Sequence, residues 1–304
     1  MRIVIVGAGG VGGYFGARLQ QAGHDVVFFA RGKHLAAIRA DGLTIESPQG
    51  NAKLKVKVFE DPAEAGPVDA VMFAVKLWDT ATAAAQIKPI VGKNTVVIPF
   101  QNGVESADML KSVLPPAAVM GGTAYIATRI RAPGVIEHTG QMVRLQFGPL
   151  IASQHRAADA FLAACRQAGL NAELADDIVR ANWEKFVFLV GVSSATAVTR
   201  VPLGAVRGDP DMRWLFGEAM RETWRLARAR GVALPDNFVE SRLAFAETLH
   251  AEMRASMLHD LEAGHRLEAP WLCGAVARMS AEAGLDAPVN RAVFAALKPY
   301  VNGR

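Results

Sequence analysis

The sequence predicts a two-domain α/β chain, in which a doubly wound parallel sheet is followed by an all-α domain. Its 304 residues exceed what one hydrophobic core usually organises. Short apolar, β-branched runs alternate with helical patterns in the first half, and long helical patterns fill the second half. The change comes near Asp176, so we expect domains at residues 1–176 and 177–304.

Four runs in the first half have the near-continuous apolar character of strands buried on both faces of a parallel sheet. They are Arg2–Val6, Asp25–Ala30, Asp69–Val75 and Asn94–Pro99. Helical patterns lie between them, at Val11–Ala22 and Leu77–Ile90 among others. This alternation is typical of a doubly wound sheet.

Beyond Gly103 the sequence predicts further strands and then a change to helices. The strand-like segments lie around Ala118–Thr128, Val135–His138 and Val143–Phe147. A helix is predicted from about Ser153 to Ala168, and a last short strand in "GLNAELADD". From Ile178 onward Ala, Leu, Met and Arg recur at helical spacing, which predicts the all-α domain.

The composition is that of a globular chain with ample core material, at 51% hydrophobic and 20% charged residues. Subtracting 29 acidic from 33 basic residues gives a net charge of +4, and the basic residues are scattered, so no nucleic-acid partner is expected. The first apolar run ends at Gly7 and is too short for a signal peptide. No stretch approaches the length of a membrane span, and we expect a cytoplasmic protein.

Residue types argue against three other kinds of site. Cys165 and Cys273 are the only cysteines and lie in apolar helical patterns, which predicts buried thiols rather than a disulfide. The histidines show neither an HExxH pattern nor paired cysteine ligands, so no metal site is expected. The segment "GVSSA" lacks the GxSxG pattern of a serine hydrolase.

The segment "VIVGAGGVGGYFGARL" contains Gly7-x-Gly9-x-x-Gly12, directly after a predicted strand and at the start of a predicted helix. Gly7 permits a tight turn, Gly9 lets the backbone approach a pyrophosphate, and Gly12 lets helix and strand pack closely. The helix N-terminus supplies N–H groups and positive potential. In this context the pattern predicts a Rossmann-like dinucleotide site, with Gly10 as a further cofactor contact.

The end of the second predicted strand, "FFARGKH", indicates which dinucleotide binds. NAD-binding proteins carry an acidic residue there, whereas this chain has Arg31 and Lys33. Asp25 begins that strand and is poorly placed to contact the ribose. Because a guanidinium group suits a 2′-phosphate, Arg31 predicts NADP(H) rather than NAD(H).

Lys185 stands at the head of a nearly unbroken apolar run, Phe186 to Val192. A lysine is rarely buried without a partner, because removing water from an ammonium group is costly. Either its aliphatic stem crosses the apolar surface to reach water, or it faces a polar pocket. In the second case the apolar neighbours would lower its pKa toward the operating range of an acid catalyst.

With these features the chain resembles the ketopantoate reductase (2-dehydropantoate 2-reductase) family over nearly its whole length. Beyond the glycine turn and Arg31, short motifs occur in the family's order and at compatible spacing. They are "AVK" ending at Lys76, "QNG" at Gln101–Gly103, "WxK" at Trp183–Lys185, and "SMLHD" at Ser256–Asp260 followed by Glu268. Each motif is short, and their joint order carries the resemblance.

The resemblance implies NADPH-dependent reduction of a 2-oxo acid, with 2-dehydropantoate (ketopantoate) as the first substrate to consider. It implies that Lys76 and Asn102 lie along the ribose and nicotinamide of the cofactor, Asn102 also being near the substrate. It implies that Lys185 donates the proton, that Glu268 is the matching acid, and that Ser256 contacts the substrate. The helical domain would hold the substrate and provide a homodimer contact.

Three positions depart from the family pattern, which often carries asparagine there. They are Leu189 and Ser193, one and two turns beyond the lysine, and Cys273. Ser193 retains a polar group and is a candidate substrate contact. Fewer polar contacts weaken discrimination for a hydroxylated substrate. One alternative is therefore a D-2-hydroxyacid dehydrogenase acting on bulkier apolar 2-oxo acids. Another is a non-catalytic NADP-binding regulator, which would keep the glycine turn but need no Lys185.

Overall fold

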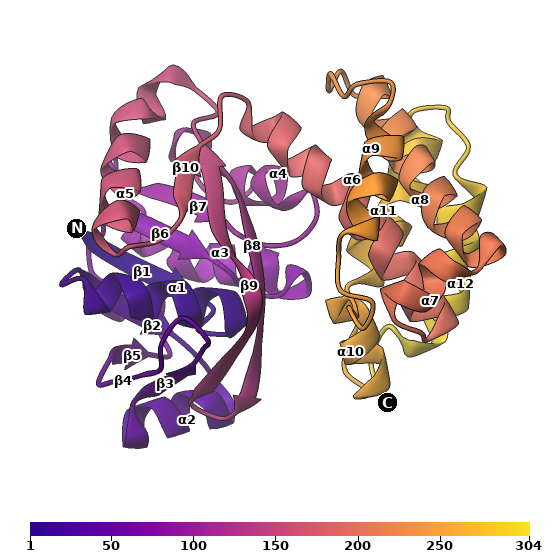
Figure 1. Cartoon of the computed structure of the whole chain (residues 1–304). Helices are drawn as coiled ribbons and strands as arrows, with labels where there is room; N and C mark the ends of the chain where they lie inside the picture. The colour runs from indigo at the N-terminus through magenta and orange to yellow at the C-terminus, as the bar shows by residue number, and fades with distance from the viewer. The chain divides into compact units, whose positions relative to one another are not determined.

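The computed structural model describes all 304 residues, which form two compact units, Met1–Ala181 and Asn182–Arg304 (Figure 1). Both β-sheets belong to the first unit, and the second unit consists of helices. The predicted fold class is confirmed: a Rossmann-like α/β region precedes an all-α region.

The first sheet has five parallel strands in the order β5-β2-β1-β6-β7. The strands are β1 (Arg2–Val6), β2 (Asp25–Phe29), β5 (Lys57–Phe59), β6 (Ala70–Phe73) and β7 (Val96–Pro99). The first helices are α1 (Gly10–Gln21), α2 (Gly32–Asp41), α3 (Thr80–Ile87) and α4 (Ser106–Lys111). All four predicted strands are present, and β5 was not predicted.

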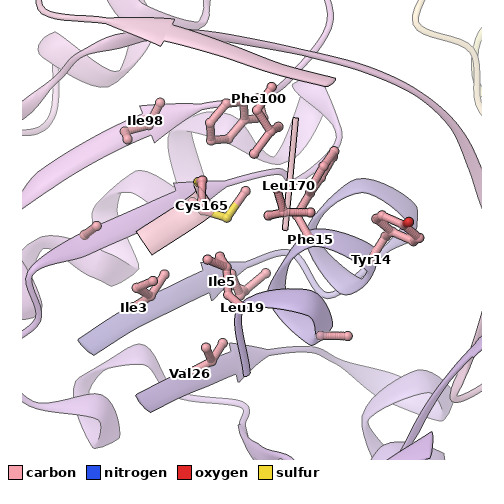
Figure 2. Packing of buried hydrophobic residues seen from close by; sticks show 14 of the residues in the cluster. Ile3, Ile5, Tyr14, Phe15, Leu19, Val26, Ile98, Phe100, Cys165 and Leu170 are labelled. Atoms are coloured by element: carbon pink, nitrogen blue, oxygen red, sulfur yellow. The ribbon is translucent and has the colours of Figure 1, made fainter. Parts of the chain in front are cut away.

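Strand β1 shows why near-continuous apolar runs form this sheet. Its side chains alternate between two cores, because successive residues of a strand point to opposite faces. Ile3 and Ile5 join the core that contains α1, and Figure 2 shows them on the same side of the strand. Val4 and Val6 join a second core on the other face. Both faces of the strand are therefore buried.

The helix predicted over Leu77–Ile90 is interrupted in the structure. Helix α3 is flanked by two 3-10 turns, η2 (Leu77–Asp79) and η3 (Lys88–Ile90). Pro89 lies in the second turn, where its ring and missing N–H prevent regular helix from continuing. The interruption at η2 matters for function, because that turn follows the carboxyl end of β6.

A second sheet in the first unit was not predicted as a sheet. Its order is β10-β9-β3-β4, with β8 paired to β9. The strands are β3 (Leu43–Glu46), β4 (Ala52–Leu54), β8 (Gly121–Ala132), β9 (Val135–Gly148) and β10 (Ala172–Leu174). The two segments predicted at 135–138 and 143–147 form one strand, because a register shift opposite Ile126 and Ala127 accommodates the residues between them.

The remaining helices belong largely to the second unit, after α5 (His155–Gln167) of the first. They are α6 (Ile178–Thr199), α7 (Leu203–Gly208), α8 (Pro210–Ala229), α9 (Phe238–Glu247), α10 (Ser256–Glu262), α11 (Cys273–Glu282) and α12 (Pro288–Leu297). Short 3-10 turns are η1 (Pro62–Ala65), η4 (Pro116–Ala118), η5 (Ala152–Gln154), η6 (Ala269–Trp271) and η7 (Lys298–Tyr300). None of the helices has the length and apolar character that crossing a membrane requires.

Helix α6 packs closely against α8 in the second unit. A Cβ added at Gly191 would lie 2.5 Å from Cγ of Met220, so a larger residue there would push the two helices apart. Asp209 caps the N-terminus of α8, because its carboxylate accepts hydrogen bonds from the N–H groups of Asp211 and Met212. The close contact at Gly191 holds α6, which carries Lys185, against α8.

The two cysteines are free and buried, as predicted. Burial raises the pKa of both Cys165 and Cys273 to about 12. Since the thiolate is the reactive form, neither thiol is suited to nucleophilic or redox chemistry.

Candidate active site

The glycine turn between β1 and α1 has the geometry that a dinucleotide requires. Gly7 adopts a φ of +97°, and a Cβ there would lie 2.8 Å from backbone atoms of Ala74 and Val75. A Cβ at Gly12 would lie 2.2 Å from the Gly7 oxygen, so turn and helix pack without room for a side chain. At Gly9, by contrast, a Cβ would meet nothing within 4 Å. The turn is thus tightly packed on its protein side and open at Gly9.

The N-terminus of α1 adds to this fit. It has no side-chain cap and no acidic residue in its first turn, so the helix dipole there is not neutralised by the protein. A Cβ at Gly10 would lie 2.8 Å from the hydroxyl of Thr128 in β8. Gly10 therefore lets the second sheet approach the start of α1, and its contact with cofactor stays a prediction. Together the turn and the helix end fit a pyrophosphate.

Arg31 lies beside this turn as the residue preceding α2. Its backbone is extended, and its side chain is 74% exposed. Its Nη2 atom lies 2.5 Å from Oδ2 of Asp79 in the η2 turn. The sequence analysis did not identify Asp79, because nothing in its local pattern links it to a residue in the loop after β2.

Lys76 and Asn102 follow the adjacent parallel strands β6 and β7, so they lie at the same edge of the sheet. Lys76 is exposed, and Asn102 is half-buried. Gln101 ties the two loops together, since its Nε2 atom donates to the Val75 oxygen and to the Thr80 hydroxyl, both at 2.9 Å. The first residue of the QNG motif thus has a positioning role that the sequence did not reveal.

His34 is a second residue that the sequence analysis missed. Its Nε2 atom lies 2.8 Å from the Ala8 oxygen and its Nδ1 atom accepts from the Gly134 N–H at 3.0 Å. These partners require the neutral Nε2–H tautomer, and burial lowers the pKa of His34 in agreement. The ring links the glycine turn to the β8–β9 turn. Both partners are distant in sequence, so no local motif could have indicated it.

The second unit contains the pair formed by Lys185 and Glu268. Lys185 is half-buried on α6, and Glu268 is 6% exposed before the η6 turn. Burial lowers the pKa of Lys185 to about 8, while the Glu268 carboxylate acts in the opposite direction. The expected lowering of the lysine pKa is confirmed. The ammonium form still dominates at neutral pH, but it gives up its proton far more readily than an ordinary lysine.

The other predicted substrate residues lie in differing environments. Ser256 is exposed at the first position of α10. Ser193 is completely buried on α6, and its hydroxyl has no hydrogen-bond partner. Leu189 is half-buried one turn beyond Lys185, and Cys273 is buried, with its thiol 3.6 Å from the Ala269 oxygen. A substrate contact at Ser256 or Ser193 stays a prediction.

Comparisons with known proteins find relatives over nearly the whole chain. The family model "Ketopantoate reductase PanE/ApbA" matches residues 3–151, and its C-terminal counterpart matches residues 177–301. A 2-dehydropantoate 2-reductase from Archaeoglobus fulgidus is 32% identical and covers 99% of this chain and 98% of its own. The crystal structure of a PanE/ApbA family ketopantoate reductase from Ralstonia eutropha JMP134 superposes with a TM-score of 0.90 at 33% identity, covering 99% and 98% of the two chains.

A D-mandelate dehydrogenase, solved with NADH and anilino(oxo)acetate, has a TM-score of 0.91 over 99% of this chain and 98% of that chain. At 21% identity it shows the shared fold alone.

The fold and these relatives identify the chain as a nicotinamide-dependent oxidoreductase. More specifically, the chain belongs to the ketopantoate reductase family.

Proposed function

We propose that this chain reduces a 2-oxo acid to the 2-hydroxy acid with NADPH, and that ketopantoate is converted to pantoate. The observation that carries the proposal is Lys185, whose pKa of about 8 suits a proton donor beside an acidic partner. The similarity to proteins named 2-dehydropantoate 2-reductase supports the substrate. Arg31, at the end of β2, supports NADPH.

The nucleotide would be held by the first unit. The open face at Gly9 and the uncapped start of α1 would receive the pyrophosphate. Arg31 would bind the 2′-phosphate, while Lys76 and Asn102 would contact the ribose and nicotinamide. When bound, NADPH supplies the hydride that attacks the substrate carbonyl carbon.

The second unit would supply the proton. Lys185 donates it to the carbonyl oxygen, and its positive charge stabilises the negative charge that develops there as the C=O bond is reduced. The lysine is then neutral and recovers a proton from solvent. Glu268 raises the pKa of the lysine and so counteracts the lowering caused by burial. This favours the protonated form before each turnover.

A second candidate is reduction of bulkier, more apolar 2-oxo acids by the same chemistry. Leu189 motivates it, because an apolar side chain one turn beyond Lys185 replaces a polar one common in the family. The shared fold of D-mandelate dehydrogenase is compatible with this alternative. Family membership favours an enzyme over the non-catalytic regulator.

A substrate panel tests the proposal. Purified protein is mixed with NADPH or NADH and with ketopantoate, branched 2-oxo acids or aromatic 2-oxo acids, and loss of the reduced-nicotinamide absorbance is followed. The highest kcat/KM is expected for ketopantoate with NADPH. A higher kcat/KM for aromatic acids would support the second candidate, and no turnover with any acid would overturn both.

A further inference from the structure

The ion pair between Arg31 and Asp79 is the starting observation. Arg31 precedes α2 in the loop after β2, and Asp79 ends the η2 turn in the loop after β6. Their charged atoms are 2.5 Å apart. In the sheet order β2-β1-β6 these loops flank the loop after β1, which is the glycine turn. The pair therefore joins two loops across the glycine turn.

Backbone contacts confirm that the turn lies between the two loops. The Ala8 N–H donates to the Phe29 oxygen at the end of β2. On the other side, Gly7 approaches Ala74 and Val75 at the end of β6. Nucleotides bind beyond the carboxyl ends of parallel strands, beside this turn. The guanidinium group that would bind a 2′-phosphate is thus paired with a carboxylate at the edge of the same site.

Asp79 is held in place independently of Arg31. Its N–H donates to the Lys76 oxygen at 2.9 Å. Gln101 bonds to Val75 before the turn and to Thr80 after it, which fixes the segment on both sides. The Asp79 side chain is 22% exposed, against 74% for Arg31. When the guanidinium moves toward a ligand, the carboxylate stays on a fixed turn.

This arrangement affects the two nicotinamide nucleotides differently. A phosphate monoester carries about −1.5 to −2 charges at neutral pH, so it competes with Asp79 for Arg31 and is repelled by the carboxylate. NADH has a ribose hydroxyl at that position. A carboxylate does not repel this hydroxyl and readily accepts a hydrogen bond from it. A repulsive group of this kind contributes to specificity by weakening the binding of one of the two ligands.

We infer that Asp79 reduces the preference of this site for NADP(H) over NAD(H), because its carboxylate competes with the 2′-phosphate for Arg31. The inference rests on the proposed use of NADPH and adds a specificity residue from the loop after β6. The rule for NAD-binding proteins looks for an acidic residue at the end of β2. Here that position is Arg31, and the acidic group reaches it from the opposite side of the glycine turn.

The test compares equilibrium binding of NADPH and NADH to the full-length protein and to Asp79→Asn, using the fluorescence of the bound nicotinamide. We expect the Kd for NADPH to fall about three- to tenfold in the variant, and the Kd for NADH to change less than about twofold or to rise. In an Arg31→Ala background the gain from Asp79→Asn should shrink to the part that comes from direct repulsion between carboxylate and phosphate, because the competition requires the guanidinium. An undiminished gain in NADPH affinity in that background would overturn the inference that Asp79 competes for Arg31.

Asp25→Asn is the matched control. Asp25 pairs with Lys57 at 2.8 Å at the amino end of β2, so this variant also removes one carboxylate from an exposed ion pair of the same sheet. It should leave both Kd values unchanged, and an equal gain in NADPH affinity would overturn the inference. If the unaltered protein binds NADPH but Asp79→Asn leaves the ratio of the two Kd values unchanged, the proposed function stands and the inference fails. Binding of neither nucleotide overturns both.

Discussion

The region around the glycine turn in the first unit and the region around Lys185 in the second unit both contain proposed site residues. They differ in how far their charged side chains are exposed to water. In the first unit the side chain of Arg31 is largely exposed and pairs with Asp79. In the second unit Lys185 is half-buried, and its partner Glu268 is almost inaccessible to water. The charged side chain of Arg31 is thus exposed to solvent, whereas Lys185 and Glu268 are largely shielded from it.

The difference corresponds to the two tasks of the proposed reaction. A group that binds a charged ligand works while hydrated, and its contribution falls as salt screens it. A group that transfers a proton needs a pKa near the working pH, and burial is what lowers that of Lys185 to about 8. Substitutions in the two regions should therefore have separable effects on nucleotide affinity and on turnover.

Lys185→Met should give the largest effect. Methionine keeps much of the side-chain volume but has neither charge nor proton, so we expect kcat to fall by about 10²- to 10⁴-fold. The Kd for NADPH should stay within about twofold of the original, because the groups proposed to hold the pyrophosphate and the 2′-phosphate are unchanged. Steady-state kinetics and a nucleotide titration measure the two quantities.

The outcome for Lys185→Arg sharpens this prediction. Arginine retains the positive charge but does not release a proton near neutral pH, so kcat should remain low. Retention of more than about a tenth of the original kcat in Lys185→Met would contradict the assignment of the proton donor.

The geometry of the glycine turn could be predicted from the sequence because its determinants are local. Gly7, Gly9 and Gly12 follow a strand and begin a helix, and the structure explains two of the three glycines by close backbone contacts. The parallel strands were predictable for the same reason, since each is a short apolar run. Lys185 became a candidate because a charged residue is unusual within an apolar run, and its link to Glu268 came from the family resemblance.

The residues that sequence analysis missed act through contacts between distant segments. Asp79 meets Arg31, and His34 meets Gly134, only because the sheet order places their loops together. The second sheet was missed for the same reason, since strands β3 and β4 are three or four residues long and gain stability from pairing. Pairing between distant strands is not visible in a local pattern.

Glu222→Gln tests whether Glu222, a second buried carboxylate of this unit, has a structural role rather than the catalytic role proposed for Glu268. Glu222 is 2% exposed and accepts from the N–H groups of Val289 and Asn290 and from Asn290 Nδ2, each at 2.8 Å. The substitution replaces one carboxylate oxygen, an acceptor, with an NH₂ group, a donor. It also removes a negative charge near the start of α12. We expect the free energy of unfolding to fall by about 2 kcal/mol, measured by denaturant unfolding.

The same variant should leave the Kd for NADPH unchanged, and its kcat should be normal at temperatures where the protein is folded. A large loss of kcat without loss of stability would mean that burial alone does not distinguish structural from catalytic carboxylates in this unit.

Gly9→Ala and Gly12→Ala form a matched pair in the first unit. A methyl group at Gly9 meets nothing within 4 Å, so the protein should fold normally. Its Kd for NADPH should rise about tenfold, because the methyl occupies the side on which a phosphate would approach. At Gly12 the methyl would lie 2.2 Å from the Gly7 oxygen, so that variant should lose stability.

Thermal unfolding and nucleotide titration distinguish the two effects. Gly92→Ala serves as the control, since its methyl would meet only the Thr95 hydroxyl at 3.7 Å. If Gly9→Ala bound NADPH as tightly as the original protein, the open face of the turn would not be where the pyrophosphate lies.

The smallest effect should be a shift in a pH profile. The kcat/KM for reduction should be constant below about pH 8 and fall above it, because the Lys185 ammonium is lost as the pH passes its pKa. Removing the Glu268 carboxylate removes the influence that raises this pKa. In Glu268→Gln the fall should therefore begin at a lower pH than in the original protein.

Oxidation of the hydroxy acid should show the mirror image, rising through the same pH because the neutral lysine then accepts the proton. Glu222→Gln, which removes a buried carboxylate of the same unit that bonds to α12, should leave the inflection where it is. An inflection that stays fixed in Glu268→Gln, or that moves to higher pH, would show that Glu268 does not act on the proton donor. Lys185 and Glu268 would then have only a structural relation to one another. They would differ from Arg31 and Asp79 in burial but not in function.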